Sequence, residues 1–312
     1  MRTDEAVQSG DGQAPGTTGT IEPLEPTAQA PPLAQPVPRG PGAFLADTAT
    51  LYARSLLKLR RRPVMLYFSL VQPMIWLLLF GQLFNRITRF PGAAQAFGGK
   101  SYFQFFMPAV ILQTILFGAA QSGIGIIADM DSGFLDKLLT TPVSRMAILL
   151  GKVLGDLTRM LIQALVIVAL TWVFGQLQAE RVRYEYGIPG ILGALGIAVL
   201  VALALAGFHV FVALRTRNTE TAFLIANFLT LPLLFTSSAQ LPLQLLPEWL
   251  QVVARFNPVT YAIEVMRIAF NGPQAVPDQD AGRVILIALV VLTALAVFTL
   301  SLAVRSFRRA VR

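Results

Sequence analysis

Six long stretches of the sequence contain no Asp, Glu, Lys or Arg, and together they fill most of the chain between residues 64 and 304. An α-helix rises about 1.5 Å per residue, so roughly 20 apolar residues cross the ~30 Å hydrocarbon core of a bilayer. The stretches are residues 64–84, 101–128, 160–179, 186–214, 221–247 and 284–304. Each reaches that length, and backbone amides in lipid must be paired within the chain, which favours helices.

The six stretches predict an all-α integral membrane protein with six transmembrane helices. Composition agrees with this fold class, because 54% of the residues are hydrophobic and 13% are charged, whereas soluble domains average about 25% charged residues. We expect residues 44–312 to form the membrane domain, in which an amphipathic helix precedes the first span and a short outer helical hairpin precedes the last. The expected spans are about 64–84, 104–128, 158–178, 188–213, 221–241 and 284–304.

The first 43 residues have a different composition, with eight Pro, six Gly, no Lys and no aromatic residue. Such a segment cannot bury enough apolar surface to offset the entropy that it would lose on ordering. It also lacks the basic start and the apolar core of a signal peptide. We expect residues 1–43 to be a disordered cytoplasmic tail.

The Lys and Arg residues are distributed unevenly between the two sides of the predicted membrane domain. If both termini are cytoplasmic, 17 of the 25 basic residues lie on the cytoplasmic side, in agreement with the positive-inside rule. The exception is the first outer loop, which carries Arg86, Arg89 and Lys100. Topology thus explains the net charge of +8 without a nucleic-acid partner. We expect a multi-pass protein of the plasma (inner) membrane with the lipid bilayer around it.

Residues 47–62 are predicted to form an amphipathic interfacial helix. Arg54, Lys58 and Arg61 fall at i, i+4 and i+7 on one face, and apolar residues occupy the opposite face. A basic amphipathic helix just before a span is expected to lie in the membrane interface, with its cations among anionic headgroups. The alternative is an ordinary basic flank that only sets the topology.

Residues 247–270 are predicted to form outer re-entrant helices before the last span. Asn257 and Pro258 supply an N-cap and a proline at the first helical position. The helix that they open has about 12 residues and is too short to cross a bilayer. We expect it to lie on, or dip into, the outer half of the membrane. Its Glu264 and Arg267 are three residues apart and are expected to pair.

Polar residues within the charge-free stretches allow two interpretations. Gln113, Gln121, Ser237 and Gln240 either bond across helix contacts or line a substrate path. The single histidine, His209, cannot form a metal site alone and is interpreted as a packing residue. No His/Asp/Ser set occurs, and the stretches lack the charges that ion-coupled carriers bury at mid-membrane. We expect no catalytic residue, no metal site and no cofactor bound by this chain.

The segment AQAFGGKS at residues 94–101 nearly matches the phosphate-binding pattern G-x-x-x-x-G-K-[ST], with Ala94 in place of the first glycine. A functional loop of this kind joins a strand to a helix, whereas this segment is expected in an outer loop between spans. The chain therefore has no ATPase motif of its own and is not expected to be an enzyme. A secondary carrier or channel that acts without an ATPase, and a scaffold without transport activity, stay open as alternatives.

Residues 129–152, between the second and third spans, are predicted to form a cytoplasmic loop with a short helix that Ser132 caps. The apolar face of this helix comprises Leu135, Leu138 and Leu139. Asp136 and Lys137 are expected to point away from it. An apolar face without an internal partner suits docking into a groove of another protein. The alternative is a plain re-entry turn that covers the base of the bundle.

In these features the sequence resembles the membrane permease subunits of type-2 ABC exporters, close in style to daunorubicin-resistance permeases. One shared pattern, G-x-L-x-x-L-x-x-T-P-V-S-R, occupies residues 133–145, and a second, N-P-x-T-Y-x-x-E-x-x-R, occupies residues 257–267. The third shared feature is the amphipathic helix before the first span. The resemblance covers about residues 44–308. The sequence departs from the family's pattern at Met130, where such permeases often carry Arg.

The resemblance implies a permease subunit of an ATP-driven exporter, which moves amphipathic drug-like or lipid-like substrates in multidrug efflux. Two permeases, either identical or sister chains, would pair above cytoplasmic ATPase subunits, and ATP and Mg²⁺ would bind in those partner subunits. The residues implied in coupling to the ATPase are Asp131, Gly133, Leu135, Asp136, Lys137, Leu138, Leu139, Thr141 and Pro142. The residues implied in an outer gate are Asn257, Pro258, Tyr261, Glu264 and Arg267.

Overall fold

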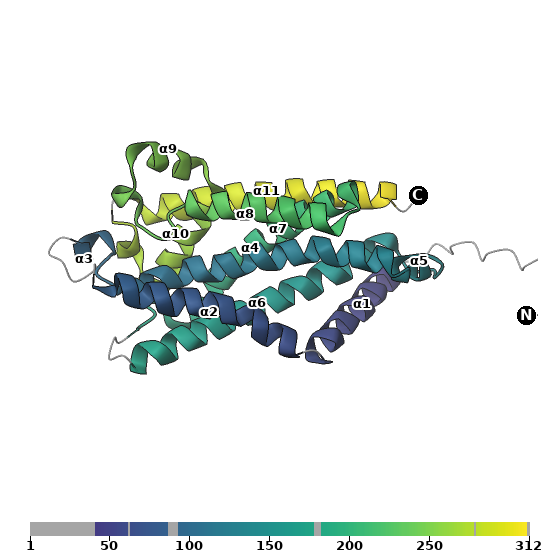
Figure 1. Cartoon of the computed structure of the whole chain (residues 1–312), viewed down its shortest axis with the longest axis horizontal. Helices are drawn as coiled ribbons and strands as arrows, with labels where there is room; N and C mark the ends of the chain where they lie inside the picture. Colours follow the sequence, from purple (N-terminus) through teal and green to yellow (C-terminus); the bar gives the residue numbers. More distant parts are fainter. Residues whose placement is uncertain (1–40, 62, 87–92, 178–181, 278, 311–312) are drawn as a thin grey trace, which may run out of the picture. The chain divides into compact units, whose positions relative to one another are not determined.

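The computed structural model describes residues 41–61, 63–86, 93–177, 182–277 and 279–310, in which the regular elements are helices (Figure 1). Of the predicted tail, residues 1–40 lie outside the described residues. The longer helices are α1 (Pro41–Arg61), α2 (Pro63–Asn85), α4 (Tyr102–Asp131), α6 (Arg145–Leu177), α7 (Gly187–Thr216), α8 (Thr219–Phe235), α9 (Glu248–Phe256), α10 (Pro258–Asn271) and α11 (Ala281–Ala310). The shorter ones are α3 (Ala93–Ala96), α5 (Phe134–Leu139), η2 (Leu243–Leu245) and η3 (Pro273–Ala275).

Five helices are long and apolar enough to cross a membrane, namely α4, α6, α7 and α11 over their whole length and α2 over Leu66–Phe84. α8 is also apolar but has only 17 residues. The α-helix ends at Phe235, and residues 236–240 form turns and a bend. The helix within the predicted span 221–241 is therefore shorter than expected. A topology with six spans remains a prediction.

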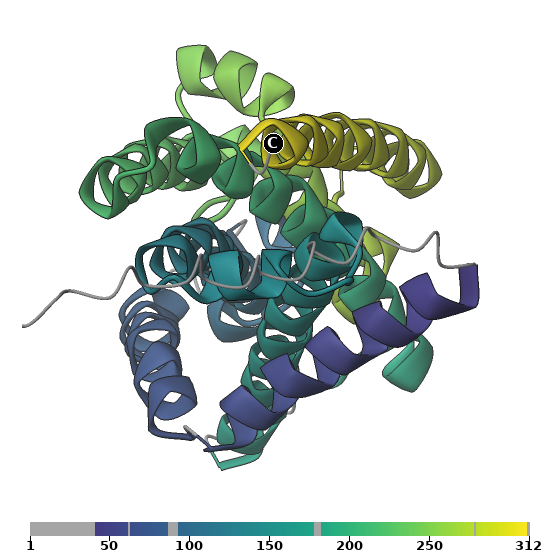
Figure 2. The same ribbon diagram turned by 90° about the vertical axis from the view of Figure 1, so that its right-hand side faces the viewer.

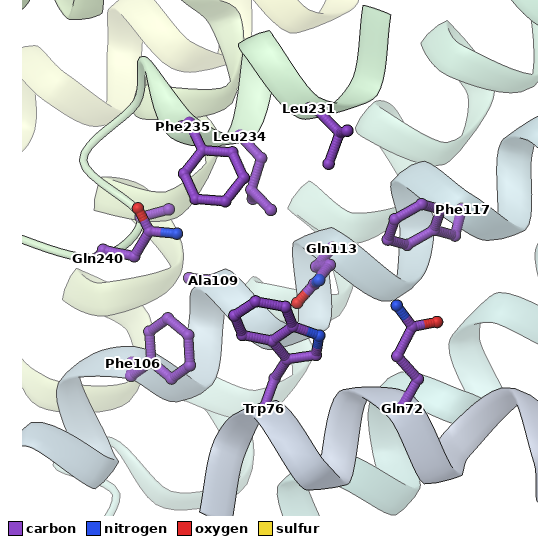
Figure 3. A pocket seen from close by; sticks show the side chains of 11 residues that line it. Gln72, Trp76, Phe106, Ala109, Gln113, Phe117, Leu231, Leu234, Phe235 and Gln240 are labelled. Atoms are coloured by element: carbon purple, nitrogen blue, oxygen red, sulfur yellow. The ribbon is translucent and has the colours of Figure 1, made fainter. Parts of the chain in front are cut away.

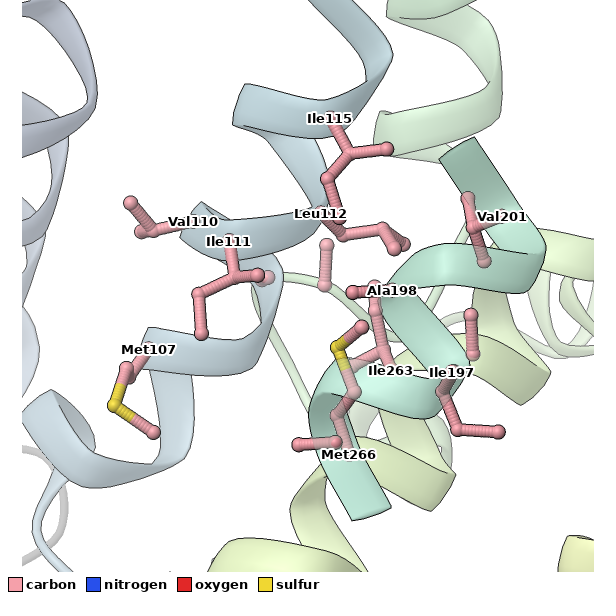
Figure 4. Close-up of a cluster of buried hydrophobic side chains, with 14 of the residues drawn as sticks. Met107, Val110, Ile111, Leu112, Ile115, Ile197, Ala198, Val201, Ile263 and Met266 are labelled. Atoms are coloured by element: carbon pink, nitrogen blue, oxygen red, sulfur yellow. The ribbon is translucent and has the colours of Figure 1, made fainter. Parts of the chain in front are cut away.

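The central helix of the bundle is α4, which contacts α2, α6, α7, α8 and α10. Figures 1 and 2 show α8 and α11 on one side of α4 and α7, and α1, α2 and α6 on the other. Side chains of α4 such as Ile111 and Leu112 meet those of α7 and α10, including Ala198 and Met266 (Figure 4). The core is predominantly apolar, and the hydroxyl of Thr114, which is buried on α4, donates to the carbonyl of Val110 at 2.9 Å, since burying an unpaired polar group is costly.

The contact between α4 and α7 requires a glycine. A Cβ atom at Gly123 would lie 2.5 Å from the carbonyl oxygen of His209, and no side chain fits at that separation. The His209 ring is buried, lies edge-on to Phe208, and has its Nδ1 2.8 Å from the carbonyl oxygen of Leu205. These contacts favour the packing interpretation of His209.

The segment at residues 94–101 joins one helix to another. It comprises the end of α3, a turn in which Gly98 has a φ of +65°, and Ser101, which caps α4 by accepting a hydrogen bond from the amide of Gln104 at 3.4 Å. The strand that a phosphate-binding loop follows is replaced here by a helix, so the geometry of that motif is not formed.

Candidate functional site

The loop between α4 and α6 turns at a left-handed glycine. Gly133 has a φ of 64° and is the residue before α5, a conformation that side chains with a Cβ adopt only at a cost of roughly 1 kcal/mol. Ser132 does not cap α5 as predicted, because it is the C-cap of α4 and its hydroxyl donates to the carbonyl of Asp129 at 3.3 Å. Thr140 and Thr141 close the other end of α5 by donating to Lys137 and Leu138 carbonyls.

The apolar face of α5 is not free. Leu135 is buried, and Leu138 and Leu139 are half-buried, in a cluster that contains Ile148 of α6 and Phe307 of α11. The prediction that this face lacks an internal partner is therefore wrong, because Leu135 is buried in this cluster with side chains of α4, α6, α7 and α11. The alternative interpretation of this loop, a turn that covers the base of the bundle, fits the apolar side of α5. The outer side of α5 and its flanking turns is mostly polar, and the exposed residues there are Asp131, Ser132, Asp136, Lys137, Thr140, Thr141 and Pro142.

α1 packs closely along the first half of α6. A Cβ atom at Gly151 would lie 2.7 Å from the Cβ of Leu51, so a glycine is needed for the two backbones to approach. The hydroxyls of Tyr52 and Thr158 are 3.0 Å apart and form a hydrogen bond. Where an interfacial helix was predicted at residues 47–62, α1 spans Pro41–Arg61 and packs against α6; residue 62 lies outside the described residues, and the position of α1 at the membrane interface stays a prediction.

α1 also contacts the loop that carries α5. The guanidinium of Arg54 lies 3.8 Å from the centre of the Phe134 ring, a cation–π contact worth roughly 0.5–1 kcal/mol at an exposed site. The carboxylate of Asp47 accepts a hydrogen bond from the amide of Ser144 at 3.4 Å. Lys58 and Arg61 are exposed like Arg54. Movement of α5 would therefore be transmitted both to α6 through the chain and to α1 through these contacts.

Two ion pairs stabilise the same end of the bundle. Lys152 Nζ lies 2.6 Å from an oxygen of Asp129, which ties α6 to α4. Arg159 lies 3.7 Å from Asp156 on its own helix, as the spacing predicts, and it also donates to the Gly118 carbonyl at 3.1 Å. The pair between Lys152 and Asp129 was not predicted, because it joins residues on different helices.

At the other end of the bundle, Asn257 links α8 to α10. Its side-chain oxygen accepts from the amide of Val259 at 2.9 Å, which confirms the predicted N-cap. Its amide nitrogen donates to the carbonyl of Leu233 at 2.7 Å and lies 3.1 Å from the hydroxyl oxygen of Thr236. Pro258 follows as the first residue of α10, and the Tyr261 hydroxyl donates to the carbonyl of Arg255 at 2.7 Å.

Arg267 is buried at this same end of the bundle. Its guanidinium donates to the carbonyls of Ser238, Ala239 and Phe105 at 2.6, 3.1 and 3.2 Å, and it lies 3.5 Å from the centre of the Phe105 ring. These carbonyls belong to the turn after α8 and to α4. The single side chain of Arg267 therefore joins three segments.

The predicted ion pair between Glu264 and Arg267 is not formed. Glu264 accepts instead from the side-chain amide of Gln279 at 3.3 Å, while the guanidinium of Arg267 donates its hydrogen bonds to backbone carbonyls. Burial raises the pKa of the Glu264 carboxyl, and the nearby Arg267 and Gln279 act in the opposite direction. The carbonyls of the turn after α8 compete for the guanidinium because they have no other partner in a helix.

α9 and α10 differ in their surroundings. α10 is largely buried against α7, α11 and α4, and its expected place on, or dipping into, the outer half of the membrane stays a prediction. α9 instead exposes an apolar face formed by Trp249, Val252, Val253 and Phe256.

A pocket of about 60 Å³ lies between α2, α4 and the end of α8 (Figure 3). Gln113 and Gln240, two of the predicted path residues, both line it, together with Gln72 and Trp76 of α2. Gln72 was not among the predicted path residues, although a polar residue within an apolar span could have indicated it. The structure thus brings amide groups from three segments to one apolar pocket.

The other two predicted path residues lie elsewhere. Gln121 is exposed on α4, two turns beyond Gln113 on a similar helix face, which follows from the helical repeat. Ser237 is buried within the turn after α8, where its hydroxyl donates to the Leu234 carbonyl at 2.6 Å and accepts from the Ala239 amide at 3.2 Å. Ser237 therefore has a structural role in that turn.

Replacing Arg267 with Met is predicted to destabilise the fold by about 3 kcal/mol or more, because each unpaired buried carbonyl costs roughly 1–3 kcal/mol. Thermal unfolding of the purified variant in detergent measures this effect. The control is Arg255→Met, which removes an exposed guanidinium and is expected to leave the melting temperature nearly unchanged. Equal melting temperatures for Arg267→Met and the unmodified protein would contradict this role of Arg267.

Comparison with known proteins gives a consistent result. Residues 47–271 match the family model described as ABC-2 type transporter. The ycf38 protein of Pyropia yezoensis, described as a transport permease, is 33% identical over 73% of this chain and 75% of its own length. The daunorubicin resistance ABC transporter permease protein DrrB1 of Streptomyces coeruleorubidus is 25% identical over 73% of this chain and 76% of its own. The inner membrane transport permease YadH of Escherichia coli is 26% identical over 67% and 78%.

Proposed function

The chain belongs to the ABC-2 type transporter family, whose members are membrane components of ABC transporters, and from that premise we propose that it is the permease subunit of an ATP-driven exporter. Its substrate would be an amphipathic, drug-like or lipid-like molecule. The observation that carries this proposal is the α5 loop, whose polar side is exposed while α1 and α6 hold it from both sides. ATP and Mg²⁺ would be bound by a separate ATPase subunit.

The ATPase would dock on the polar side of α5. The leucines of α5 face the bundle, so the exposed charges of Asp131, Asp136 and Lys137 are left to contact the partner. Gly133 and the threonines of the loop fix the shape of the turn. Charge pairs at the rim of an interface mainly set orientation and partner choice, which suits a contact that must form with one kind of subunit.

Force applied at α5 would reach the membrane by two routes. The first is the chain itself, because α6 follows α5 directly and runs for 33 residues. The second is α1, which contacts Phe134 through Arg54 and packs on α6 at Gly151. A push on the loop would thus move α1 and α6 together rather than bend the loop alone.

The proposed orientation places both termini and the α5 loop in the cytoplasm and α9 and α10 outside, in the plasma (inner) membrane. The distribution of Lys and Arg supports it. Lys58 and Arg61 of α1 are exposed and can meet anionic headgroups at the cytoplasmic surface.

The substrate path would lie beside α2, α4 and α8, where Gln72, Gln113 and Gln240 line an apolar pocket. A volume of about 60 Å³ is too small for a drug-sized molecule, since such sites usually measure roughly 300–1,000 Å³. A second permease, identical or a sister chain, would therefore face this side and complete the path. Arg267 and Asn257 would hold the outer end of α8 in its closed position.

Replacing Asp136 with Lys is predicted to weaken binding of the ATPase at least about tenfold, because like charges across an interface are strongly unfavourable. The measurement is co-purification of the permease with its ATPase and the ATP hydrolysis rate of the complex. Insertion into the membrane should be unchanged.

The matched control for that variant is Glu248→Lys, an exposed charge reversal on α9, which should leave hydrolysis unchanged. Normal hydrolysis with Asp136→Lys would contradict the docking surface. Transport by the purified chain alone, in liposomes without ATP, would favour a carrier or channel instead.

Replacing Gln113 with Leu is predicted to reduce ATP-dependent transport of daunorubicin, the drug named for the Streptomyces relative, by roughly two- to tenfold, which corresponds to one lost hydrogen bond. Uptake into inverted vesicles measures it. Gln121→Leu, on the same helix but outside the pocket, serves as the control. An equal effect of the two substitutions would show that the pocket does not line the path.

A further inference from the structure

A second cavity, of about 170 Å³, lies between α7, α8, α10 and α11. Its lining is apolar apart from Thr299, whose hydroxyl donates to carbonyls of its own helix at 2.9 and 3.2 Å. The floor is formed by buried side chains of α7 and α11 such as Val201 and Leu292. No group in the lining offers a free hydrogen bond to water or to a polar ligand.

An apolar crevice of this size favours apolar molecules over water. Engineered cavities of roughly 150 Å³ with similar linings stay dry and take up apolar molecules. Two of its walls, α7 and α11, are long enough to cross a membrane, so the medium around the cavity is lipid. α8 and α11 also expose apolar side chains, among them Phe228 and Phe298. In a membrane, the apolar molecule available to fill the cavity is therefore a lipid acyl chain.

The charge at one end of α7 indicates which lipid. Arg215 lies seven residues after Phe208, which lines the cavity, and residues seven apart lie on nearly the same helix face about 10 Å from each other. Arg215 is exposed, and among the described residues it makes no ion pair, only a cation–π contact at 5.9 Å with Phe211. Its guanidinium is thus available to a phosphate group.

The end of α11 adds further positive charge near Arg215. Phe307 and Ala303 of α11 share a hydrophobic cluster with Leu214 of α7, so the two helix ends lie together. Arg305, Arg308 and Arg309 are exposed there. Clustered basic residues at the ends of membrane helices attract anionic headgroups by about 1 kcal/mol per residue.

We propose that the crevice between α7, α8 and α11 binds one acyl chain of an anionic phospholipid, with the headgroup phosphate at Arg215 and the chain running past Phe208 into the cavity. This site lies apart from the pocket lined by Gln113 and does not depend on the proposed transport function. It also does not depend on which side of the membrane Arg215 faces.

The test uses the purified full-length chain in detergent, titrated with dioleoyl phosphatidylglycerol or dioleoyl phosphatidylcholine and measured by native mass spectrometry. The unmodified protein is expected to retain phosphatidylglycerol about fivefold better, and Arg215→Gln to lose this preference. The control is Arg183→Gln, an exposed arginine before the other end of α7, which should keep it. Equal retention of the two lipids by the unmodified protein would overturn the headgroup assignment.

The cavity itself is tested with Ala204→Phe, which places a ring in the lining and should reduce retention of both lipids about tenfold, in line with the lost burial of about two methylene groups. If this variant unfolds, Leu295→Trp narrows the half-buried rim instead. Unchanged lipid retention in a folded variant would overturn the proposal.

A second copy of the chain is the competing occupant. The chain has no cysteine, so Leu295→Cys provides a single thiol at the rim. The proposal expects this variant to stay monomeric under oxidation on a denaturing gel. A disulfide-linked dimer would show that another protein chain, and not lipid, covers the crevice.

Discussion

Backbone amides within a bilayer must be paired inside the chain, and most of the structure follows from this constraint. The long charge-free stretches satisfy it as helices. Where a helix ends inside the bundle, side chains must replace the missing partners. The turn after α8 is an example, because the Arg267 side chain donates hydrogen bonds to the carbonyls of Ser238 and Ala239, and the Asn257 side chain donates to that of Leu233. These two polar residues hold the end of the bundle near α10 in one arrangement.

The opposite end is built on a different principle. There the short helix α5 buries its leucines on the bundle and presents charge outward. Two close contacts with α1, at Phe134 and at Gly151, make α1, α5 and the start of α6 one mechanical unit. A subunit that supplies force needs a rigid surface of this kind, since a mobile loop would absorb the movement. The proposed coupling function therefore rests on packing as much as on charge.

The sequence predicts what lies within one helix and misses what joins different helices. The charge-free stretches, the long α6 and the N-cap at Asn257 follow from local patterns. The partners of Arg267 lie 28, 29 and 162 residues away along the chain, so spacing alone favoured the nearby Glu264. For the same reason the packing of α5 on the bundle was given only as the alternative, and the pair between Asp129 and Lys152 was not predicted. Gln113 and Gln240 were predicted as path residues because glutamine is unusual in a membrane span. That the two line one pocket is seen only in the folded structure.

The central claim is that the polar side of α5 faces the cytoplasm, at the opposite side of the membrane from α9. The absence of native cysteines allows a direct measurement with Asp136→Cys and Trp249→Cys variants and a maleimide that cannot cross membranes. The account predicts that Asp136→Cys reacts in inverted vesicles and is protected in intact cells, and that Trp249→Cys shows the reverse. Labelling of Asp136→Cys in intact cells would contradict it.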